Sequence, residues 1–259
     1  MFKKGGKSLP FRAKFSDART WKRIVDAISV LVDEAIFRAN ENSMRVRAMD
    51  PSHVAMVDIY LPAGIFDEYA CSGEVAIGLN LDEMGKVMRR AGTNDELELV
   101  LDEAASSLRV HLKGATTRTF RLSLLDIGGE EPPTPSIKFN VEAKMLSDAL
   151  VQALKDAELF SDHVRVSATP DGVQIAASGD TSGVEVKIDK GSEALLELSV
   201  AESSRAIYAL SYLSDMIKAA SVSETITLSF STDMPLKLEF RVLGEGKVTY
   251  WLAPRIEAE

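Results

Sequence analysis

The sequence predicts an α+β protein of two similar domains, each built from antiparallel sheets and two helices. The chain follows one plan twice, in residues 11–125 and again in residues 136–254. Each copy contains a strand, an amphipathic helix, several strands with alternating apolar residues, a second amphipathic helix and further strands. A duplication of this kind predicts two domains related by pseudosymmetry.

Apolar positions recur between the copies at a nearly constant spacing. From the second helix onward the offset is 129 residues, and it reaches 130 near the end of each copy. The matched pairs are Leu81/Leu210, Met84/Leu213, Val87/Met216, Met88/Ile217, Ala91/Ala220, Leu97/Ile226, Leu99/Leu228, Phe120/Tyr250 and Leu122/Leu252. Near the start, Lys14-Phe15 matches Lys138-Phe139 at an offset of 124, which predicts about five inserted residues in the first helical region of the second copy.

The elements of the first copy follow from the spacing of its apolar residues. A helix is expected over residues 17–33, where Trp21, Ile24, Val25, Ile28, Leu31 and Val32 form one apolar face. Alternating runs predict strands over residues 44–49, 54–61, 75–79, 97–101, 108–112 and 117–124. A second helix is expected over residues 81–91, with Asn80 as its N-cap and Gly92 as its stop.

Residues 125–135 contain three prolines and two glycines, so they predict a connector and neither a strand nor a helix. The second copy predicts a helix near residues 142–156 and strands over residues 164–168, 173–177, 184–188, 195–200, 225–231, 236–242 and 249–252. We therefore expect a mobile extension at residues 1–10, domain 1 at 11–124, the connector at 125–135, domain 2 at 136–254 and a tail at 255–259.

Composition limits the class of protein. A length of 259 residues with 46% hydrophobic content is enough for one or two packed domains. The single Cys71 excludes an internal disulfide framework and fits a reducing, intracellular setting. No stretch approaches the roughly 20 apolar residues of a membrane span. The net charge of −9 argues against a general nucleic-acid binder, although a basic stripe can lie on an acidic protein.

The residues that catalysis needs do not gather in this sequence. His53, His111 and His163 have no regular spacing and no nearby cysteine, so metal binding is not expected. The run Asp50-Pro51-Ser52-His53 is interpreted as a turn, because catalytic triads are assembled from distant segments. Gly128-Gly129 is followed by neither a helix start nor a Lys-Ser/Thr pair, so it is not a phosphate loop. We expect no enzymatic activity and no cofactor.

Four short segments resemble the proliferating cell nuclear antigen family, the sliding clamps of archaeal and eukaryotic cells. They are Met49-Asp50-Pro51-Ser52-His53-Val54, Leu125-Asp126-Ile127, Asp233-Met234-Pro235-Leu236 and Leu252-Ala253-Pro254-Arg255-Ile256-Glu257. The resemblance covers the chain from Phe11 to Glu257, and the Met-Asp-Pro-Ser-His wording is closest to archaeal members. It implies the DNA-clamp fold, a closed trimeric ring with helices lining the central hole. It also implies a location with the DNA, in the cytoplasm of an archaeon or the nucleus of a eukaryote.

The resemblance also implies how the ring closes. Members pair edge strands of neighbouring subunits, which here correspond to residues 116–122 and 182–188, and this pairing covers edges that would otherwise be exposed. The implied interface residues are Thr117, Thr119, Arg121, Val184, Val186 and Ile188. The sequence leaves open whether three identical chains or distinct subunits form the ring.

A clamp holds DNA by encircling it, so its inner face needs only scattered cations that attract phosphates without reading sequence. By position in the family, the DNA-facing residues are Lys22, Arg23, Lys86, Arg89, Arg90 and Lys218. The alternative is an ordinary solvated helix face. The expected helix at 142–156 carries only Lys144 and Lys155 against three carboxylates, so the second domain is expected to be less basic there.

The family also binds partner peptides that carry a hydrophobic plug and aromatic residues, in an apolar pocket between the connector and the second domain. Here the pocket residues would be Met49, His53, Ile127, Pro235, Trp251, Ala253 and Pro254. For Met49 and Trp251 the alternative is core packing. The implied partners are double-stranded DNA, DNA polymerase, the clamp loader, flap endonuclease, DNA ligase and other clamp subunits, with no membrane partner.

The expected function is therefore that of a DNA sliding clamp, a processivity factor that tethers replication and repair enzymes. One alternative is a specialised clamp-like subunit of a mixed ring, for example in damage signalling. The intact Asp-Pro-Ser-His and Ala-Pro-Arg-Ile-Glu segments argue against it. A duplicated α+β enzyme is a remote alternative, because it would need a convergent polar cluster.

Overall fold

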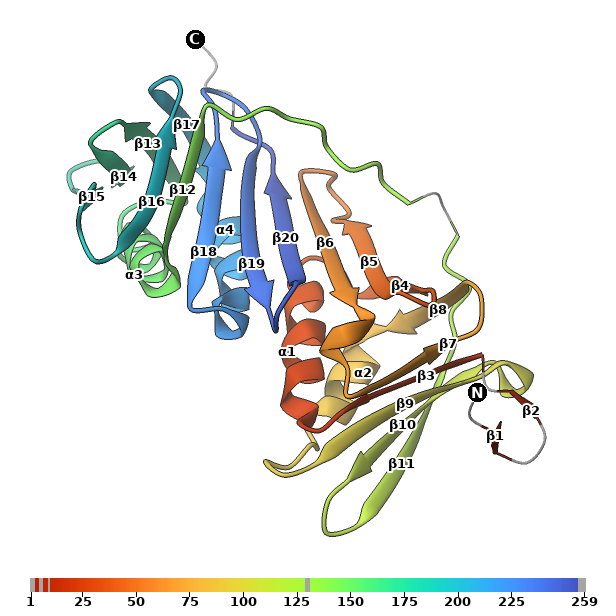
Figure 1. Cartoon of the computed structure of the whole chain (residues 1–259). Coiled ribbons are helices and arrows are strands. Elements are labelled where there is room, and N and C mark those ends of the chain that lie inside the picture. Colours follow the sequence, from red (N-terminus) through yellow and green to blue (C-terminus); the bar gives the residue numbers. More distant parts are fainter. Residues whose placement is uncertain (1–2, 5–6, 9, 129–130, 256–259) are drawn as a thin grey trace. The chain divides into compact units, whose positions relative to one another are not determined.

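The computed structural model describes residues 3–4, 7–8, 10–128 and 131–255, which form two compact units (Figure 1). Unit 1 comprises residues 1–49, 57–132 and 242–247, and unit 2 comprises residues 50–56, 133–241 and 248–259. Residues 1, 2, 5, 6 and 9 of the expected extension and residues 256–259 of the expected tail lie outside the described residues. The two short strands β1 (Lys3–Lys4) and β2 (Lys7–Ser8) pair with each other.

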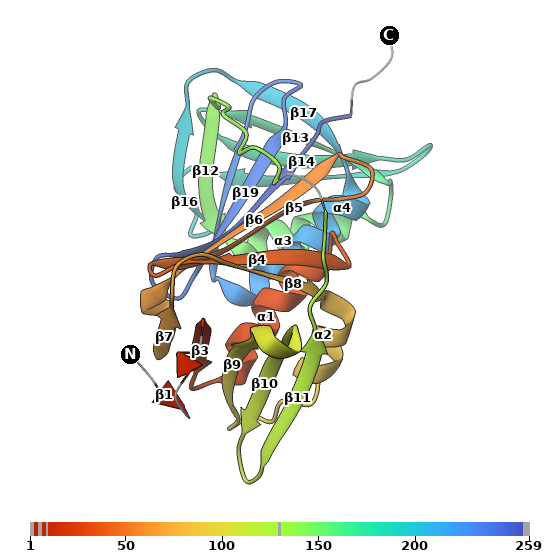
Figure 2. The same cartoon turned by 90° about the vertical axis from the view of Figure 1, so that its right-hand side faces the viewer.

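Besides the β1-β2 pair, the described part of unit 1 contains two larger sheets and two α-helices. The sheets have the strand orders β11-β10-β9-β3-β7 and β6-β5-β4-β8. The strands are β3 (Phe11–Phe15), β4 (Glu34–Ala39), β5 (Ser43–Met49), β6 (Ala55–Pro62), β7 (Glu68–Cys71), β8 (Val75–Asn80), β9 (Glu96–Asp102), β10 (Ser107–Lys113) and β11 (Thr117–Ser123). The helices α1 (Ala18–Ser29) and α2 (Leu81–Met88) lie side by side, α1 against β9 and α2 against β11 (Figure 2). Two 3₁₀ turns are η1 (Ala63–Ile65) and η2 (Glu103–Ala105).

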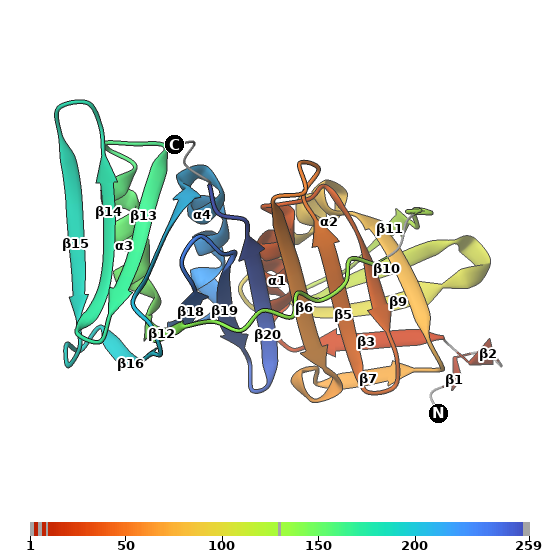
Figure 3. The same cartoon turned by 90° about the horizontal axis from the view of Figure 1, so that it is seen from above.

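Unit 2 has the corresponding sheets, with the strand orders β20-β19-β18-β12-β16 and β15-β14-β13-β17. The strands are β12 (Val141–Leu146), β13 (His163–Thr169), β14 (Gly172–Ser178), β15 (Gly183–Asp189), β16 (Leu195–Val200), β17 (Ser204–Ala209), β18 (Thr225–Phe230), β19 (Leu236–Val242) and β20 (Gly246–Leu252). Helix α3 (Ser147–Ala157) packs against β14 (Figure 3). Helix α4 (Leu210–Met216) continues into a 3₁₀ turn, η3 (Ile217–Val222).

The two units repeat the same order of equivalent strands, which confirms the expected duplication. Helices α1 and α3 begin 129 residues apart, as do α2 and α4. Strands β9, β10 and β11 likewise begin 129 residues before β18, β19 and β20. Both units are α+β with antiparallel strand pairing.

The offset of 124 predicted near the start of each copy is wrong. Phe15 ends β3, whereas Phe139 precedes β12 and lies in no strand. The helices that follow β3 and β12 begin at Ala18 and Ser147, so the offset of 129 already holds there. The second copy therefore has no insertion of about five residues in its first helical region.

The helix predicted near residues 142–156 is wrong in its first part, because residues 141–146 form β12. Val141, Ala143 and Met145 are buried and alternate with more exposed residues, which is the pattern of a strand with one buried face. Helix α3 begins only at Ser147. Lys144, which had been expected on a helix, lies on β12 with its Nζ 2.8 Å from Glu197 Oε1.

The remaining elements differ from expectation in three strands that were missed and in the ends of the first two helices. Strands β4, β7 and β17 were not predicted. The first helix ends at Ser29 and the second at Met88, so both are shorter than expected. The N-cap prediction for α2 is confirmed, because the Glu83 N–H donates to Asn80 Oδ1 at 2.9 Å. The corresponding cap of α1 is Asp17, which accepts from the Arg19 N–H at 2.9 Å.

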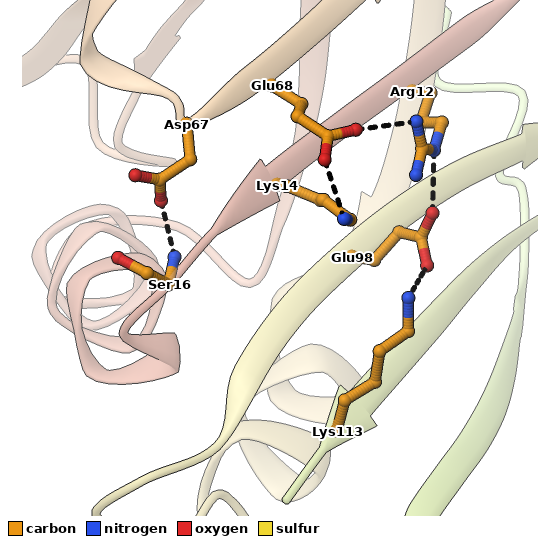
Figure 4. Close-up of polar contacts among 7 residues, drawn as sticks. All are labelled: Arg12, Lys14, Ser16, Asp67, Glu68, Glu98 and Lys113. Carbon is orange, nitrogen blue, oxygen red and sulfur yellow. Dashed lines mark hydrogen bonds and ion pairs between the residues drawn. The ribbon is translucent and has the colours of Figure 1, made fainter. Parts of the chain in front are cut away.

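A row of ion pairs crosses the sheet of unit 1 from β7 to β10 (Figure 4). Arg12 lies at its centre, with Nη1 2.7 Å from Glu68 Oε2 and Nε 2.6 Å from Glu98 Oε1. Lys14 also contacts Glu68, at 2.7 Å, and Lys113 contacts the second oxygen of Glu98. Burial by itself would raise the pKa of Glu98, but the hydrogen bonds from Lys113 and Arg12 lower it to about 2.

Candidate functional site

The six predicted DNA-facing residues all lie on or beside helices. Lys22 and Arg23 are on α1, Lys86 is on α2, and Arg89 and Arg90 follow α2 directly. Lys218 is in η3, after α4. All of these side chains except Lys22, which is half-buried, are exposed. The structure therefore puts the six residues on helix surfaces, where contact with a ligand is sterically open.

Three of these cations are paired with a carboxylate on the same helical segment. Lys22 lies 2.5 Å from Asp26, and Lys86 lies 2.6 Å from Asp82. Lys218 pairs with Asp215. Exposed pairs of this kind contribute little to stability, so a phosphate can compete with the carboxylate for the ammonium group.

The basic excess is confined to the helices of unit 1. From Asp17 to Ser29 the chain carries three cations and two carboxylates, and the same numbers are found from Asp82 to Arg90. Helix α3 instead carries Lys155 with two carboxylates. The segment Leu210–Val222 carries one cation and one carboxylate. The expectation that the second domain is less basic at these helices agrees with this distribution.

The predicted interface residues lie on β11 and β15. Each of these strands is the last in its sheet within the described part of the chain, so one side of its backbone is unpaired there. On β11 the side chains of Thr117, Thr119 and Arg121 are exposed. On β15, Val184 and Val186 are half-buried, whereas Ile188 is only 5% exposed. Ile188 therefore packs in the core of unit 2 and offers a neighbour mainly its backbone.

Five of the predicted pocket residues belong to unit 2. Trp251 is half-buried on β20, with its ring centroid 6.1 Å from that of Phe139, and Lys237 Nζ lies 5.9 Å from the Phe139 centroid. Among the described residues the buried Trp251 Nε1 has no hydrogen-bond partner. A buried donor without an acceptor is unfavourable, and this nitrogen is shielded by the protein around it. Phe139 was not among the predicted members of this cluster.

The loop of residues 50–56 groups with unit 2 and lies beside the end of β20. The Ala253 N–H donates to Val54 O at 2.8 Å. His53 adopts a left-handed conformation with φ of 60°, and Pro235, Ala253 and Pro254 are half-buried. Two exposed apolar side chains that were not predicted, Val54 and Met234, border these residues in sequence. The unit 2 part of the predicted pocket thus has an accessible apolar character.

Asp50 organises this loop. Its carboxylate accepts the N–H groups of Ser52, Val54 and Ala55 at 2.7–2.9 Å and the Tyr212 hydroxyl at 2.8 Å. Burial by itself would raise the pKa of Asp50, but these four hydrogen bonds hold the pKa below its usual value. The expected turn at Asp50-Pro51-Ser52-His53 is therefore present, with Tyr212 of α4 as an additional donor.

The other two predicted pocket residues, Met49 and Ile127, belong to unit 1 and are half-buried. Ile127 follows a segment that is held to β8, because the Leu125 N–H donates to Gly78 O at 2.9 Å. A Cβ at position 78 would lie 2.2 Å from Leu125 O, so this approach requires glycine.

Within the described ranges, no group of three or more His, Cys, Asp or Glu residues could hold a metal ion. His111 Nδ1 lies 2.8 Å from Thr119 Oγ1, and His163 Nδ1 lies 2.8 Å from Asp162 Oδ1. No helix among the described residues has the length and apolar character that crossing a membrane requires.

Comparison with known proteins places both halves of the chain in one family. The description of the proliferating cell nuclear antigen N-terminal domain matches residues 10–130, and that of the C-terminal domain matches residues 134–255. A relative from Pyrococcus horikoshii named DNA polymerase sliding clamp is 37% identical over 249 residues, 96% of this chain and 100% of that protein. A relative of the same name from Thermofilum pendens is 37% identical over 244 residues, 94% of this chain and 98% of its own length.

Solved structures show the same fold. The crystal structure of proliferating cell nuclear antigen from Thermococcus kodakaraensis matches with a TM-score of 0.90 and 31% identity, covering 95% of this chain and 100% of that one. The corresponding structure from Entamoeba histolytica matches with a TM-score of 0.89 over 96% of this chain and 100% of that one; at 24% identity it supports the fold alone.

Proposed function

Because the chain belongs to the proliferating cell nuclear antigen family, we propose that it is a DNA sliding clamp, which encircles duplex DNA and tethers the enzymes that act on it. The observation that carries this proposal is the match of both family domains, in order, on two units with the same strand order. The protein acts by topology and tethering and has no catalytic step of its own. It contacts DNA through phosphates, without reading sequence.

The clamp is a ring of three chains joined head to tail through β11 of one chain and β15 of the next. Two unpaired strand edges on one chain support this arrangement, because a heterologous contact that repeats by rotation closes a ring. Pairing would also cover edges that are prone to aggregation when they stay open.

The inner surface of the ring carries Lys22, Arg23, Lys86, Arg89, Arg90 and Lys218. Their placement on exposed helix surfaces supports this role. With half of them paired to carboxylates, the attraction to DNA is weak, which suits a protein that must slide.

Partner proteins, among them DNA polymerase, the clamp loader, flap endonuclease and DNA ligase, bind through short peptides with an aliphatic plug and aromatic anchors. The peptide contacts Met49, His53, Ile127, Pro235, Trp251, Ala253 and Pro254. The half-buried Trp251 and the exposed Val54 and Met234 nearby in sequence support this assignment. Apolar surface with few polar groups is what an aromatic-anchored peptide needs.

The first test is the mass in solution, measured by light scattering during gel filtration. A ring of identical chains gives about 85 kDa, three times the 28.2 kDa of one chain. The same sample is then loaded on nicked circular DNA, and retention is compared before and after the circle is linearised. Loss of the protein only from linear DNA supports encirclement, and equal retention on both would contradict it. A mass of one chain, raised by adding other clamp subunits from the same cell, would support the mixed ring instead.

The peptide site is tested with Ile127→Ala and Trp251→Ala together. Stimulation of a cognate DNA polymerase should be lost while the mass of the assembly stays unchanged, because the variants remove anchor contacts and leave the strand edges intact. Leu159→Ala is the matched control, since Leu159 is 75% exposed and lies outside the proposed site. Full stimulation by the double variant would rule out this peptide site.

A further inference from the structure

On either side of residues 129–130, the connector after β11 lies along the sheet β6-β5-β4-β8 of unit 1 (Figure 3). Its first fixed point is on β8, where Leu125 meets Gly78 as described above. Its second fixed point is formed by Glu131 and Pro132, which meet arginine side chains from β4 and β5. The connector is thus held at two places within unit 1.

Arg47 of β5 makes the central contacts of the second fixed point. Its Nη1 donates to Pro132 O at 2.9 Å and lies 3.2 Å from Glu131 Oε1. Its Nε donates to Asp58 Oδ2 at 3.0 Å. On the connector side, Arg38 Nε of β4 lies 3.3 Å from the other oxygen of Glu131. One guanidinium group therefore joins the sheet to the connector.

Burial makes this contact specific. The Arg47 side chain is 8% exposed and that of Asp58 is 9% exposed, so both charges depend on their partners. The planar guanidinium can donate to Asp58 from one edge and to the connector from another. A lysine has a single ammonium group and cannot make both sets of hydrogen bonds. If Glu131 and Pro132 moved away, Arg47 would keep only part of its hydrogen bonding in a site with little water. The connector therefore has a strongly preferred position here.

The neighbouring Arg45 provides an internal comparison. It binds the same Asp58 through two bonds, from Nε to Oδ1 at 2.9 Å and from Nη2 to Oδ2 at 2.7 Å. Among the described residues Arg45 makes no hydrogen bond or close ion pair with the connector, and only the more distant charge of Glu131 acts on it. Because Arg45 alone can neutralise Asp58, removing Arg47 leaves that buried carboxylate paired.

We propose that Arg47 is a positioning residue for partner peptides. Its contacts with Glu131 and Pro132, together called the latch, hold these residues against the sheet and thereby position the connector that carries Ile127. This inference rests on the proposed function, because it explains how the connector side of the peptide site is held in place before a peptide binds. Residues 131 and 132, already held to the sheet, do not have to be ordered when a peptide binds, and the smaller entropy cost increases affinity.

The experiment compares Arg47→Met with Arg45→Met in the full-length protein. Hydrogen exchange reports the order of the connector. Fluorescence anisotropy reports the affinity for a labelled synthetic peptide with one aliphatic and two aromatic anchors. For Arg47→Met we expect faster exchange at residues 125–135 and peptide affinity about tenfold weaker, the loss typical of having to order a short segment on binding. For Arg45→Met we expect clearly smaller changes in both quantities, because Arg45 acts on Glu131 only through its charge and makes no bond to the connector.

Glu131→Gln and Arg47→Lys separate the latch from a general loss of stability. If the latch exists, Glu131→Gln weakens peptide binding in the wild type and weakens it less in Arg47→Met, where only the Arg38 contact is left to lose, so the two changes are not additive. Arg47→Lys keeps the charge and recovers only part of the affinity. Unchanged exchange in Arg47→Met would overturn the latch, and faster exchange with unchanged affinity would overturn its role in positioning.

Failure of the proposed function has a different signature. If the wild-type protein did not bind the peptide, the peptide site and the positioning role would both be contradicted, while the exchange rates would still decide whether Arg47 holds the connector. Thermal unfolding of each variant confirms that the comparison is made between folded proteins.

Discussion

A single carboxylate, that of Asp50, defines the loop that carries His53 and Val54. Three backbone N–H groups and one hydroxyl converge on it and fix the path of the chain through the turn. The Tyr212 hydroxyl is the only one of the four donors that is a side chain, and it comes from helix α4. The loop and helix α4 of unit 2 are therefore linked through the Tyr212 hydroxyl, which bonds Asp50 and also interacts with Ser52.

Removing that hydroxyl tests the link. Tyr212→Phe should lower the free energy of unfolding by about 1–2 kcal/mol, because a hydrogen bond to an ionised carboxylate is lost while the three N–H donors remain. Urea unfolding followed by circular dichroism measures the change. Tyr60→Phe is the control: Tyr60 is 39% exposed, and a change there should stay within about 0.5 kcal/mol of the wild type. Equal effects of the two changes would show that the Asp50–Tyr212 bond adds nothing.

At the scale of residues, the sequence predicts surface positions better than long-range contacts. The helical period correctly indicated that Arg23, Lys86 and Arg89 would be exposed. Tyr212 was missed because its partner lies 162 residues away, and no local pattern records such a pairing. Arg47 was missed for the same reason, since Pro132 is 85 residues away.

At the scale of elements, the repeat contained more information than the apolar runs alone. Strands β8, β13 and β16 were predicted, but their equivalents in the other copy, β17, β4 and β7, were missed. Each missed strand begins 129 residues from its equivalent, within two residues, so the repeat could have located it. In β4 the buried residues Ala35, Phe37 and Ala39 occupy every second position. The apolar Ile36 stands between them, so the sequence does not show a clean apolar–polar alternation. In β12, Val141 and Met145 also fit a helical spacing that continues into α3, so periodicity alone favoured a helix.

The ion-pair row of Figure 4 makes the stability of unit 1 depend on pH. Folding lowers the pKa of Glu98 from 4.5 to about 2, so Glu98 contributes its full stabilisation above pH 4.5 and loses it as the pH falls towards 2. Glu98→Gln should therefore lower the free energy of unfolding at pH 7 by about 2 kcal/mol, and by progressively less below pH 4.

Denaturant unfolding at several pH values measures this difference. Glu103→Gln is a suitable control, because Glu103 is an exposed carboxylate in η2 with no ion pair among the described residues. A difference between Glu98→Gln and the wild type that stays constant from pH 7 to pH 3 would mean that the charge of Glu98 is not what stabilises the sheet.

The charge of the helices gives a second prediction at this scale. Changing Lys86 and Arg89 to Gln removes two of the three cations from Asp82 to Arg90. The residence time of the loaded clamp on circular DNA should fall at low salt and approach that of the wild type at high salt, because phosphate contacts are screened. The mass of the assembly should not change. Lys155→Gln on α3 should have a smaller effect, since carboxylates already outnumber cations on that helix. Wild-type residence at every salt concentration would remove Lys86 and Arg89 from the DNA-facing surface.

For the whole molecule, the two open edges differ in charge. Arg121 on β11 lies opposite Arg109 of β10, and like charges in that register are unfavourable unless an anion is near. Arg109 is paired with Asp102 at 2.9 Å, whereas Arg121 has no carboxylate partner in the part of the chain that the structure describes. The exposed side of β15 carries Glu185 and Asp189 with a single cation, Lys187. A basic edge and an acidic edge on one chain favour head-to-tail association over pairing of like edges.

Arg121→Glu should therefore weaken the ring while each chain stays folded. The dissociation constant of the assembly, from light scattering over a range of protein concentrations, should rise about tenfold or more, because attraction across the edge becomes repulsion. A second change of Glu185 to Lys should restore much of the affinity, since every contact in the ring then carries the exchanged pair. Arg23→Glu has the same charge change on an α1 surface and should leave the mass unchanged. If Arg121→Glu assembled as tightly as Arg23→Glu, the β11 edge would not be a subunit contact, and the ring would have to close through other strands.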